Sequence, residues 1–192
     1  MASESKQDLR RRFRQERRRA QCAAADAISR SAAAALPPLL RPSRHLGMYW
    51  PIGAEPDLRA LAQNGATGEL ALPAVVAGHL RYRAWRPGEA LVPDACGIPA
   101  PAGPAALKPD ELSLLLVPAL ALDQHGIRLG SGGGWYDRLR ADPAWRAIPA
   151  LAVLPAACIT RDLPRDPWDV PFDGWLDERG LHWLQAVSRT PG

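Results

Sequence analysis

Two neighbouring stretches decide the fold: LSLLLVPALA at residues 112–121 and RLGSGGGWYD at residues 128–137. The first is an apolar run typical of a buried strand. The second has four glycines in five positions, so its backbone can turn tightly and point successive N–H groups into one hollow that suits phosphate oxygens. Residues 135–140 predict a helix whose first turn would also favour an anion. A glycine turn without a ligand is the alternative; Arg128 and Asp137 at its two ends favour a functional loop.

The spacing within this loop excludes two familiar phosphate-binding motifs. A P-loop requires Gly-Lys followed by Ser or Thr, whereas Gly134 is followed by Trp135. The dinucleotide-binding fingerprint requires a third glycine three places after the second, and after Gly130 and Gly132 that place is again Trp135. A nucleotide at this loop would therefore bind in neither of these modes.

The composition is typical of a globular protein with one domain. The 192 residues are 47% hydrophobic and 23% charged, and no apolar run approaches the roughly 20 residues that span a bilayer. The net charge of +4 suits a polyanionic ligand, but it is concentrated near the N-terminus and does not indicate a nucleic-acid surface across the body. Three cysteines without CxxC spacing argue against a structural zinc site and a disulfide framework. They favour a reducing compartment, so we expect a cytoplasmic protein with no membrane partner.

Short apolar stretches alternate with helical ones along the chain. This alternation predicts an α/β fold, a single domain over residues 1–192 with three α/β/α layers and a mainly parallel sheet. Ligands of such folds bind beyond the carboxyl ends of the strands, where the glycine loop follows its strand. Residues 86–109 and 163–173 are rich in proline and are expected to be mostly loop. Further strands are expected at residues 45–51, 69–73, 80–85, 148–154 and 174–176.

A basic helix is predicted at residues 5–36, capped by Ser5 and ended by the two prolines that follow. Lys6, Arg10 and Arg14 fall at positions i, i+4 and i+8, so they lie along one face of this helix. Such a face can bind a polyanionic ligand, or it can simply be solvated.

Four segments together resemble the 5-formyltetrahydrofolate cyclo-ligases, also called 5,10-methenyltetrahydrofolate synthetases. They are KQDLR at residues 6–10, YWPIGAE at residues 49–55, and the stretches 116–138 and 163–173. The third segment, with Arg-Leu-Gly, the glycines and Tyr-Asp-Arg, is the most specific. In this order the four segments span nearly the whole chain.

The resemblance implies an enzyme that converts 5-formyltetrahydrofolate to 5,10-methenyltetrahydrofolate with ATP and Mg²⁺, releasing ADP and phosphate. A formamide oxygen is a poor leaving group, so the γ-phosphoryl group would be transferred to it first. The N10 nitrogen would then attack the activated carbon and expel phosphate. Such phosphoryl transfer needs positioning and neutralisation of oxygen charge more than a protein nucleophile. We expect a small-molecule folate as the partner and a monomer as the working state.

The resemblance also implies roles for individual residues. Arg128 and Asp137 would act in catalysis, and Asp137 and Asp169 would hold Mg²⁺ through oxygen atoms, which suit this hard cation. ATP would contact Lys6, Arg10, Arg128, Gly130, Ser131, Gly132, Gly133, Gly134, Trp135 and Tyr136. Folate would contact Trp50, Glu55, Trp135 and Tyr136.

Without the resemblance, several of these residues have simpler interpretations. Asp137 would be a carboxylate in the first turn of a helix, and Asp169 would be a turn-forming residue. Trp50 and Trp135 would pack in the core, and Glu55 would be solvated in its loop.

The sequence departs from the family pattern at five positions. Gly133 stands where some relatives carry Lys, and Ser131 stands where many have a larger residue. Trp135 replaces the more usual Tyr, Leu122 a common Phe, and Ala100 a common Glu. These departures affect the expected folate contacts more than the expected ATP site.

Two other functions are alternatives to the cyclo-ligase. A protein that binds nucleic acid through the basic helix is the first alternative, but it would not explain the glycine loop, Asp137 or Asp169. A regulatory protein of the same fold that binds ATP without turnover has the same motifs, and ATP binding without folate-dependent turnover would reveal it.

Overall fold

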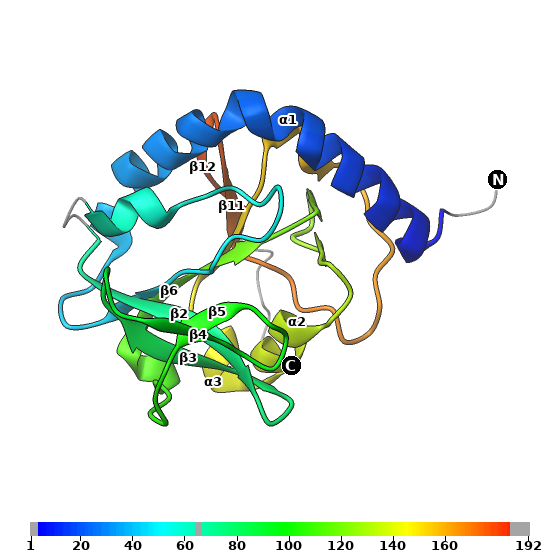
Figure 1. The fold of residues 1–192 in the computed structure, drawn as a ribbon. Coiled ribbons are helices and arrows are strands. Elements are labelled where there is room, and N and C mark those ends of the chain that lie inside the picture. Colours follow the sequence, from blue (N-terminus) through cyan, green and yellow to red (C-terminus); the bar gives the residue numbers. More distant parts are fainter. Residues whose placement is uncertain (1–3, 64–66, 185–192) are drawn as a thin grey trace.

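A seven-stranded sheet crosses the centre of the computed structural model, which describes residues 4–63 and 67–184 (Figure 1). Its five inner strands run parallel, and the strand at each edge is antiparallel to its neighbour. The prediction of an α/β fold with a mainly parallel sheet is therefore confirmed. In spatial order the strands are β12 (Gly180–Trp183), β11 (Gly174–Asp177), β9 (Ala150–Val153), β6 (Leu112–Pro118), β1 (His45–Gly47), β2 (Glu69–Val76) and β3 (His79–Trp85).

One long helix, α1 (Lys6–Ala35), covers one face of this sheet (Figure 1). The side chain of Ser5 accepts a hydrogen bond from a backbone N–H of the first turn, as expected for the predicted N-cap. Ile28 on the inner side of the helix belongs to one buried cluster with Leu46 and Leu114 of the sheet. Burial of this apolar stripe against the sheet holds the helix in place.

Two short helices, α2 (Trp135–Ala141) and α3 (Pro143–Arg146), lie on the opposite side of the sheet from α1 (Figure 1). Trp145 of α3 belongs to a second buried cluster with Leu115 and Ala150. Successive side chains of a strand point to opposite faces, so alternate residues of β6 contribute to the two clusters. The helices therefore form the outer layers of the predicted α/β/α arrangement.

A small three-stranded sheet, in the order β10 (Ile159–Thr160), β7 (Ala121–Asp123) and β8 (Arg128–Leu129), positions the glycine loop. The carboxylate of Asp123 braces it by accepting hydrogen bonds from the backbone N–H groups of Ile127, between β7 and β8, and of Leu163. The glycine loop and the 163–173 loop are thereby fixed to the same support.

The single strand predicted at residues 112–121 is wrong in its extent, because the chain changes sheets within it. The backbone N–H of Ala119 still donates to the carbonyl of Val153 in the large sheet. The N–H of Leu120 instead donates to the carbonyl of Leu129 in the small sheet. Both segments are apolar and buried, so hydrophobic patterning does not mark the change.

The prediction of mostly loop at residues 86–109 misses a hairpin of β4 (Leu91–Pro93) and β5 (Pro99–Pro101). Its turn is organised by Asp94, whose carboxylate accepts hydrogen bonds from the N–H groups of Ile98 and of Val75 on β2. The loop predicted at residues 163–173 is confirmed.

The described residues also form four short 3₁₀ helices: η1 (Pro37–Leu39), η2 (Arg59–Gln63), η3 (Pro109–Glu111) and η4 (Ala156–Cys158). Among residues 4–63 and 67–184, no helix combines the length and the apolar character that crossing a membrane requires.

Candidate functional site

A pocket of about 550 Å³ opens where β6 ends, at the edge of the sheet where the sequence predicts a ligand. Its wall is built from α1, the glycine loop and the 163–173 loop, which are far apart in the sequence. Apolar residues from β2, β3 and the β4–β5 turn complete it: Pro73, Val75, Leu80 and Ile98. One side is therefore rich in charge and backbone amides, while another is hydrophobic.

The conformation of the loop at residues 130–134 requires its glycines. Gly132 has φ 118° and Gly134 has φ 63°, values that side-chain-bearing residues rarely adopt. A Cβ at Gly130 would lie 2.6 Å from Nη1 of Arg128, and a Cβ at Gly133 would lie 2.6 Å from the indole nitrogen of Trp135. The glycines thus allow the backbone to approach the pocket with Arg128 packed directly against it.

The basic face of α1 meets this loop, as the i, i+4, i+8 spacing predicts. Arg10 donates from Nε to the carbonyl of Gly130 at 3.1 Å, and Arg14 donates from Nη2 to the carbonyl of Ser131 at 3.3 Å. These contacts bind the start of the chain to residues more than a hundred positions later. The alternative of a purely solvated helix face does not fit these contacts, because Arg10 and Arg14 both bind the glycine loop.

Lys6, at the start of the same face, is held by two carboxylates of the 163–173 loop. Its ammonium lies 2.6 Å from Oδ2 of Asp166 and 2.7 Å from Oδ2 of Asp169. Burial alone would lower the pKa of Lys6, but the hydrogen bonds and charges of the two aspartates outweigh it and raise the pKa. Lys6 therefore stays cationic at the pocket wall.

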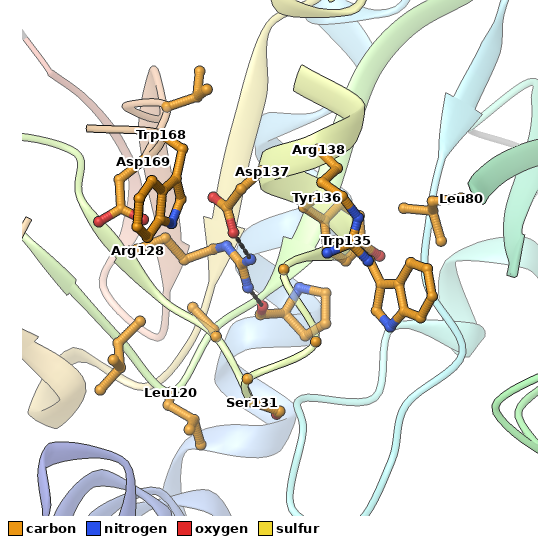
Figure 2. A pocket seen from close by; sticks show the side chains of 18 of the residues that line it. Leu80, Leu120, Arg128, Ser131, Trp135, Tyr136, Asp137, Arg138, Trp168 and Asp169 are labelled. Atoms are coloured by element: carbon orange, nitrogen blue, oxygen red, sulfur yellow. Dashed lines mark hydrogen bonds and ion pairs between the residues drawn. The ribbon is translucent and has the colours of Figure 1, made fainter. Parts of the chain in front are cut away.

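The side chain of Arg128 is buried against the glycine loop, with 6% of its surface exposed. Its guanidinium donates to the carbonyl of Pro118 at 3.1 Å and lies 3.5 Å from Oδ2 of Asp137, as Figure 2 shows. The rings of Tyr136 and Phe172 lie against it, at 5.3 and 5.5 Å from its central carbon. The two predicted catalytic residues are thus paired, and Arg128 has one fixed orientation.

Glu55 lines the pocket and is buried, so its alternative interpretation as a solvated loop residue is wrong. Its carboxylate accepts the N–H of Ile52 at 3.0 Å and lies 3.6 Å from the guanidinium of Arg17. Burial raises the pKa of Glu55, although the Ile52 N–H and the charge of Arg17 oppose the shift. Arg17 also donates to the carbonyl of Ala119 at 3.2 Å.

Comparison with known proteins identifies the family. Residues 2–177 match the model of the 5-formyltetrahydrofolate cyclo-ligase family. The chain belongs to this family. A 5-formyltetrahydrofolate cyclo-ligase of Mycolicibacterium smegmatis is 32% identical over 199 residues, which cover 94% of this chain and 98% of that protein.

Solved structures agree with the assignment to the cyclo-ligase family. The NMR structure of Aquifex aeolicus 5,10-methenyltetrahydrofolate synthetase superposes with a TM-score of 0.72 at 26% identity, covering 97% of this chain and 96% of that one. A 5,10-methenyltetrahydrofolate synthetase from Mycoplasma pneumoniae shares the fold, with a TM-score of 0.68 at 20% identity over 91% of this chain and 99% of its own. The family and its members indicate 5-formyltetrahydrofolate cyclo-ligase activity, as the sequence motifs predict.

Of the three aromatic residues predicted to contact ligands, two line the pocket and one does not. Trp135 and Tyr136 line the pocket, whereas Trp50 is not among the lining residues. Trp50 instead packs edge-on against Trp85, with the guanidinium of Arg59 over its ring at 4.7 Å. The core-packing interpretation of Trp50 therefore describes its position, and a folate contact by Trp50 stays a prediction.

Arg17 and Asp166 are among the charged lining residues that were not predicted as site residues. Arg17 continues the face of Arg10 and Arg14 by one more helical turn, so the helical spacing carried a signal for it. Asp166 lies in a proline-rich loop among several carboxylates, and nothing in the sequence singles it out as a partner of Lys6.

The two predicted metal ligands, Asp137 and Asp169, both line the pocket. Within residues 4–63 and 67–184, no group of three or more His, Cys, Asp or Glu residues is placed so that it could hold a metal ion. Mg²⁺ is commonly held by one or two carboxylates, with water and substrate phosphates completing its shell. The donor set present therefore fits Mg²⁺ in company with a nucleotide.

Proposed function

We propose that this chain is an ATP- and Mg²⁺-dependent 5-formyltetrahydrofolate cyclo-ligase that forms 5,10-methenyltetrahydrofolate and releases ADP and phosphate. One observation carries the proposal: Lys6, Arg10 and Arg128 converge with residues 130–134 on a single pocket. This combination of cations and a glycine-rich backbone suits a polyphosphate. Asp137 and Asp169 supply oxygen ligands in the same pocket.

The reaction would proceed by two displacements. The formyl oxygen attacks the γ-phosphorus and ADP leaves, which gives a phosphorylated formyl group. The N10 nitrogen then attacks the formyl carbon and loses its proton, and phosphate departs with the former formyl oxygen. A magnesium ion held by Asp137 and Asp169 would neutralise phosphate charge during the transfer.

The protein's own part in this reaction is to position the reacting groups and to neutralise the charge of the phosphate oxygens. Arg128 is buried, keeps one orientation through Pro118 and Asp137, and adjoins the glycine loop, which favours an interaction with the transferring phosphoryl group. Lys6 and Arg10 would add positive charge along the polyphosphate. No protein nucleophile is needed, because both displacements use groups of the substrates.

The hydrophobic side of the pocket suits the folate. The apolar lining residues Pro73, Val75, Leu80 and Ile98 offer a surface for a flat ring system. Glu55, which lines the same pocket and is buried, can accept hydrogen bonds from ring N–H groups or, when protonated, donate one. Three residues that depart from the family pattern also line this pocket: Ser131 and Gly133 on the glycine loop, and Trp135 at the start of α2.

Turnover is the direct test. Purified protein is supplied with 5-formyltetrahydrofolate, ATP and Mg²⁺, and the absorbance of the methenyl product is followed. We expect product only when all three are present. Folded protein that binds ATP without forming product would instead support the regulatory alternative, and tight, salt-sensitive binding of DNA or RNA would support the nucleic-acid alternative.

We further propose that residues 1–192 work as one domain and as a monomer in the cytoplasm. The support for one domain is that the match to the family model runs without interruption over residues 2–177.

A further inference from the structure

Trp168 is the most exposed large apolar side chain among residues 4–63 and 67–184, with 68% of its surface accessible. A single exposed apolar residue is ordinary on a protein surface. Trp168, however, lies in the 163–173 loop and lines the pocket. Figure 2 shows its indole beside the pocket, on the same side as Asp169. A flat aromatic face is thus available to a ligand there.

The turn that carries Trp168 is firmly held. The backbone N–H of Asp169 donates to the carbonyl of Asp166 at 3.0 Å, and the carboxylate of Asp169 accepts the N–H of Asp166 at 2.7 Å. Lys6 binds both carboxylates from α1. Pro167, directly before Trp168, restricts the backbone further. The exposed indole is therefore presented at a defined position and not by a loosely held segment.

The pocket has two sides, separated by the buried arginine. In Figure 2, Trp168 and Asp169 lie on one side of the Arg128 guanidinium, and Trp135 and Leu80 lie on the other. Leu80 belongs to the hydrophobic wall, which suits the folate. In phosphoryl transfer the attacking and leaving oxygens are roughly in line, so the acceptor and ADP lie on opposite sides of the transferring group.

We propose that Trp168 forms the base-stacking subsite of this pocket and takes the purine ring of the nucleotide. This inference rests on the proposed function, because it places folate on the Leu80 side and directs ADP toward Trp168. Phosphates beside Lys6 and Asp169 would bring the base end of the nucleotide to the neighbouring indole. Stacking of a base on an aromatic ring changes affinity by about 5- to 150-fold and tolerates different bases.

The test compares a ligand that has a base with one that lacks it. Binding of Mg-ATP and of Mg-tripolyphosphate is measured by calorimetry for the wild type, Trp168→Ala and Trp168→Phe. We expect Trp168→Ala to weaken ATP binding roughly tenfold and to leave tripolyphosphate binding unchanged. Trp168→Phe should keep most of the ATP affinity. The KM for ATP should rise in Trp168→Ala while the KM for folate stays constant.

Trp183→Ala is the matched control, because Trp183 is also an exposed tryptophan, with 47% of its surface accessible, and lies on β12 outside the pocket lining. It should bind both ligands as the wild type does. Equal ATP affinity in Trp168→Ala and wild type would overturn the subsite, as would a raised KM for folate alone. An equal loss for ATP and tripolyphosphate would also overturn it. Wild-type protein that binds no ATP would overturn the proposed function itself.

Discussion

The ammonium group of Lys6 lies 2.7 Å from a carboxylate oxygen of Asp169, so the first turn of α1 is joined to a loop near the other end of the chain. The pair is partly exposed, and such pairs add little to stability. Its importance is that a predicted phosphate ligand and a predicted metal ligand hold each other in position at the pocket. Substituting either residue should therefore affect ligand binding more than folding.

Asp169→Asn should raise the Mg²⁺ concentration needed for half-maximal turnover, because the amide removes one charge from the proposed ligand pair. We expect a shift on the order of tenfold or more, measured by titrating Mg²⁺ at saturating ATP and folate. Asp166→Asn is the matched control, since Asp166 also binds Lys6 but is not a predicted metal ligand. Equal shifts in both variants would mean that the contact to Lys6 matters and metal binding by Asp169 does not.

Asp137→Asn should lower kcat by about 100-fold or more, since Asp137 is proposed to hold the metal and it lies beside Arg128. The stability should change by less than about 1 kcal/mol, because Arg128 keeps its hydrogen bond to the carbonyl of Pro118. Steady-state kinetics and thermal unfolding measured on the same preparation separate the two effects. Full activity in this variant would remove Asp137 from the catalytic site.

Gly132→Ala should weaken ATP binding, because φ 118° suits glycine and an alanine would force the backbone of the loop into another conformation. The strain should also cost about 1–2 kcal/mol of stability. Gly88→Ala is the control: Gly88 has φ 91°, and an added Cβ there would meet nothing within 4 Å. Both variants should unfold more easily, but only Gly132→Ala should lose affinity for ATP. ATP affinity equal to wild type in Gly132→Ala would contradict the proposed role of the loop.

Much of this site could be predicted because its signals are local. The glycine loop, Arg128 and Asp137 are close neighbours in the sequence, and helical spacing puts Lys6 and Arg10 on one face. The pairing of Arg17 with Glu55 could not be predicted in the same way. This pair joins α1 to a loop through tertiary packing, and no pattern in the sequence links the two residues.

In the fold, too, the features set by neighbouring residues could be predicted, and those set by tertiary packing could not. Capping and a following pair of prolines define the bounds of α1 closely. The break at Ala119 and Leu120 was missed because both residues are apolar and both remain buried on either side of the change of sheet. Hydrophobic patterning reports burial, and β6 and β7, on either side of the break, are both buried.

Glu55 should make the stability of the protein depend on pH in a defined direction. Burial is the main cause that raises its pKa above the ordinary 4.5. A carboxyl group with a raised folded-state pKa favours folding below its ordinary pKa, and this contribution is lost as the pH rises through the raised value. Glu55→Gln removes the titration, so the variant should gain stability relative to wild type as the pH rises above 4.5. Urea unfolding of both proteins from about pH 4 to pH 8 measures the difference. A difference that is constant with pH, or that moves in favour of wild type, would show that Glu55 ionises at least as readily in the folded state as in the unfolded chain, and would contradict the raised pKa.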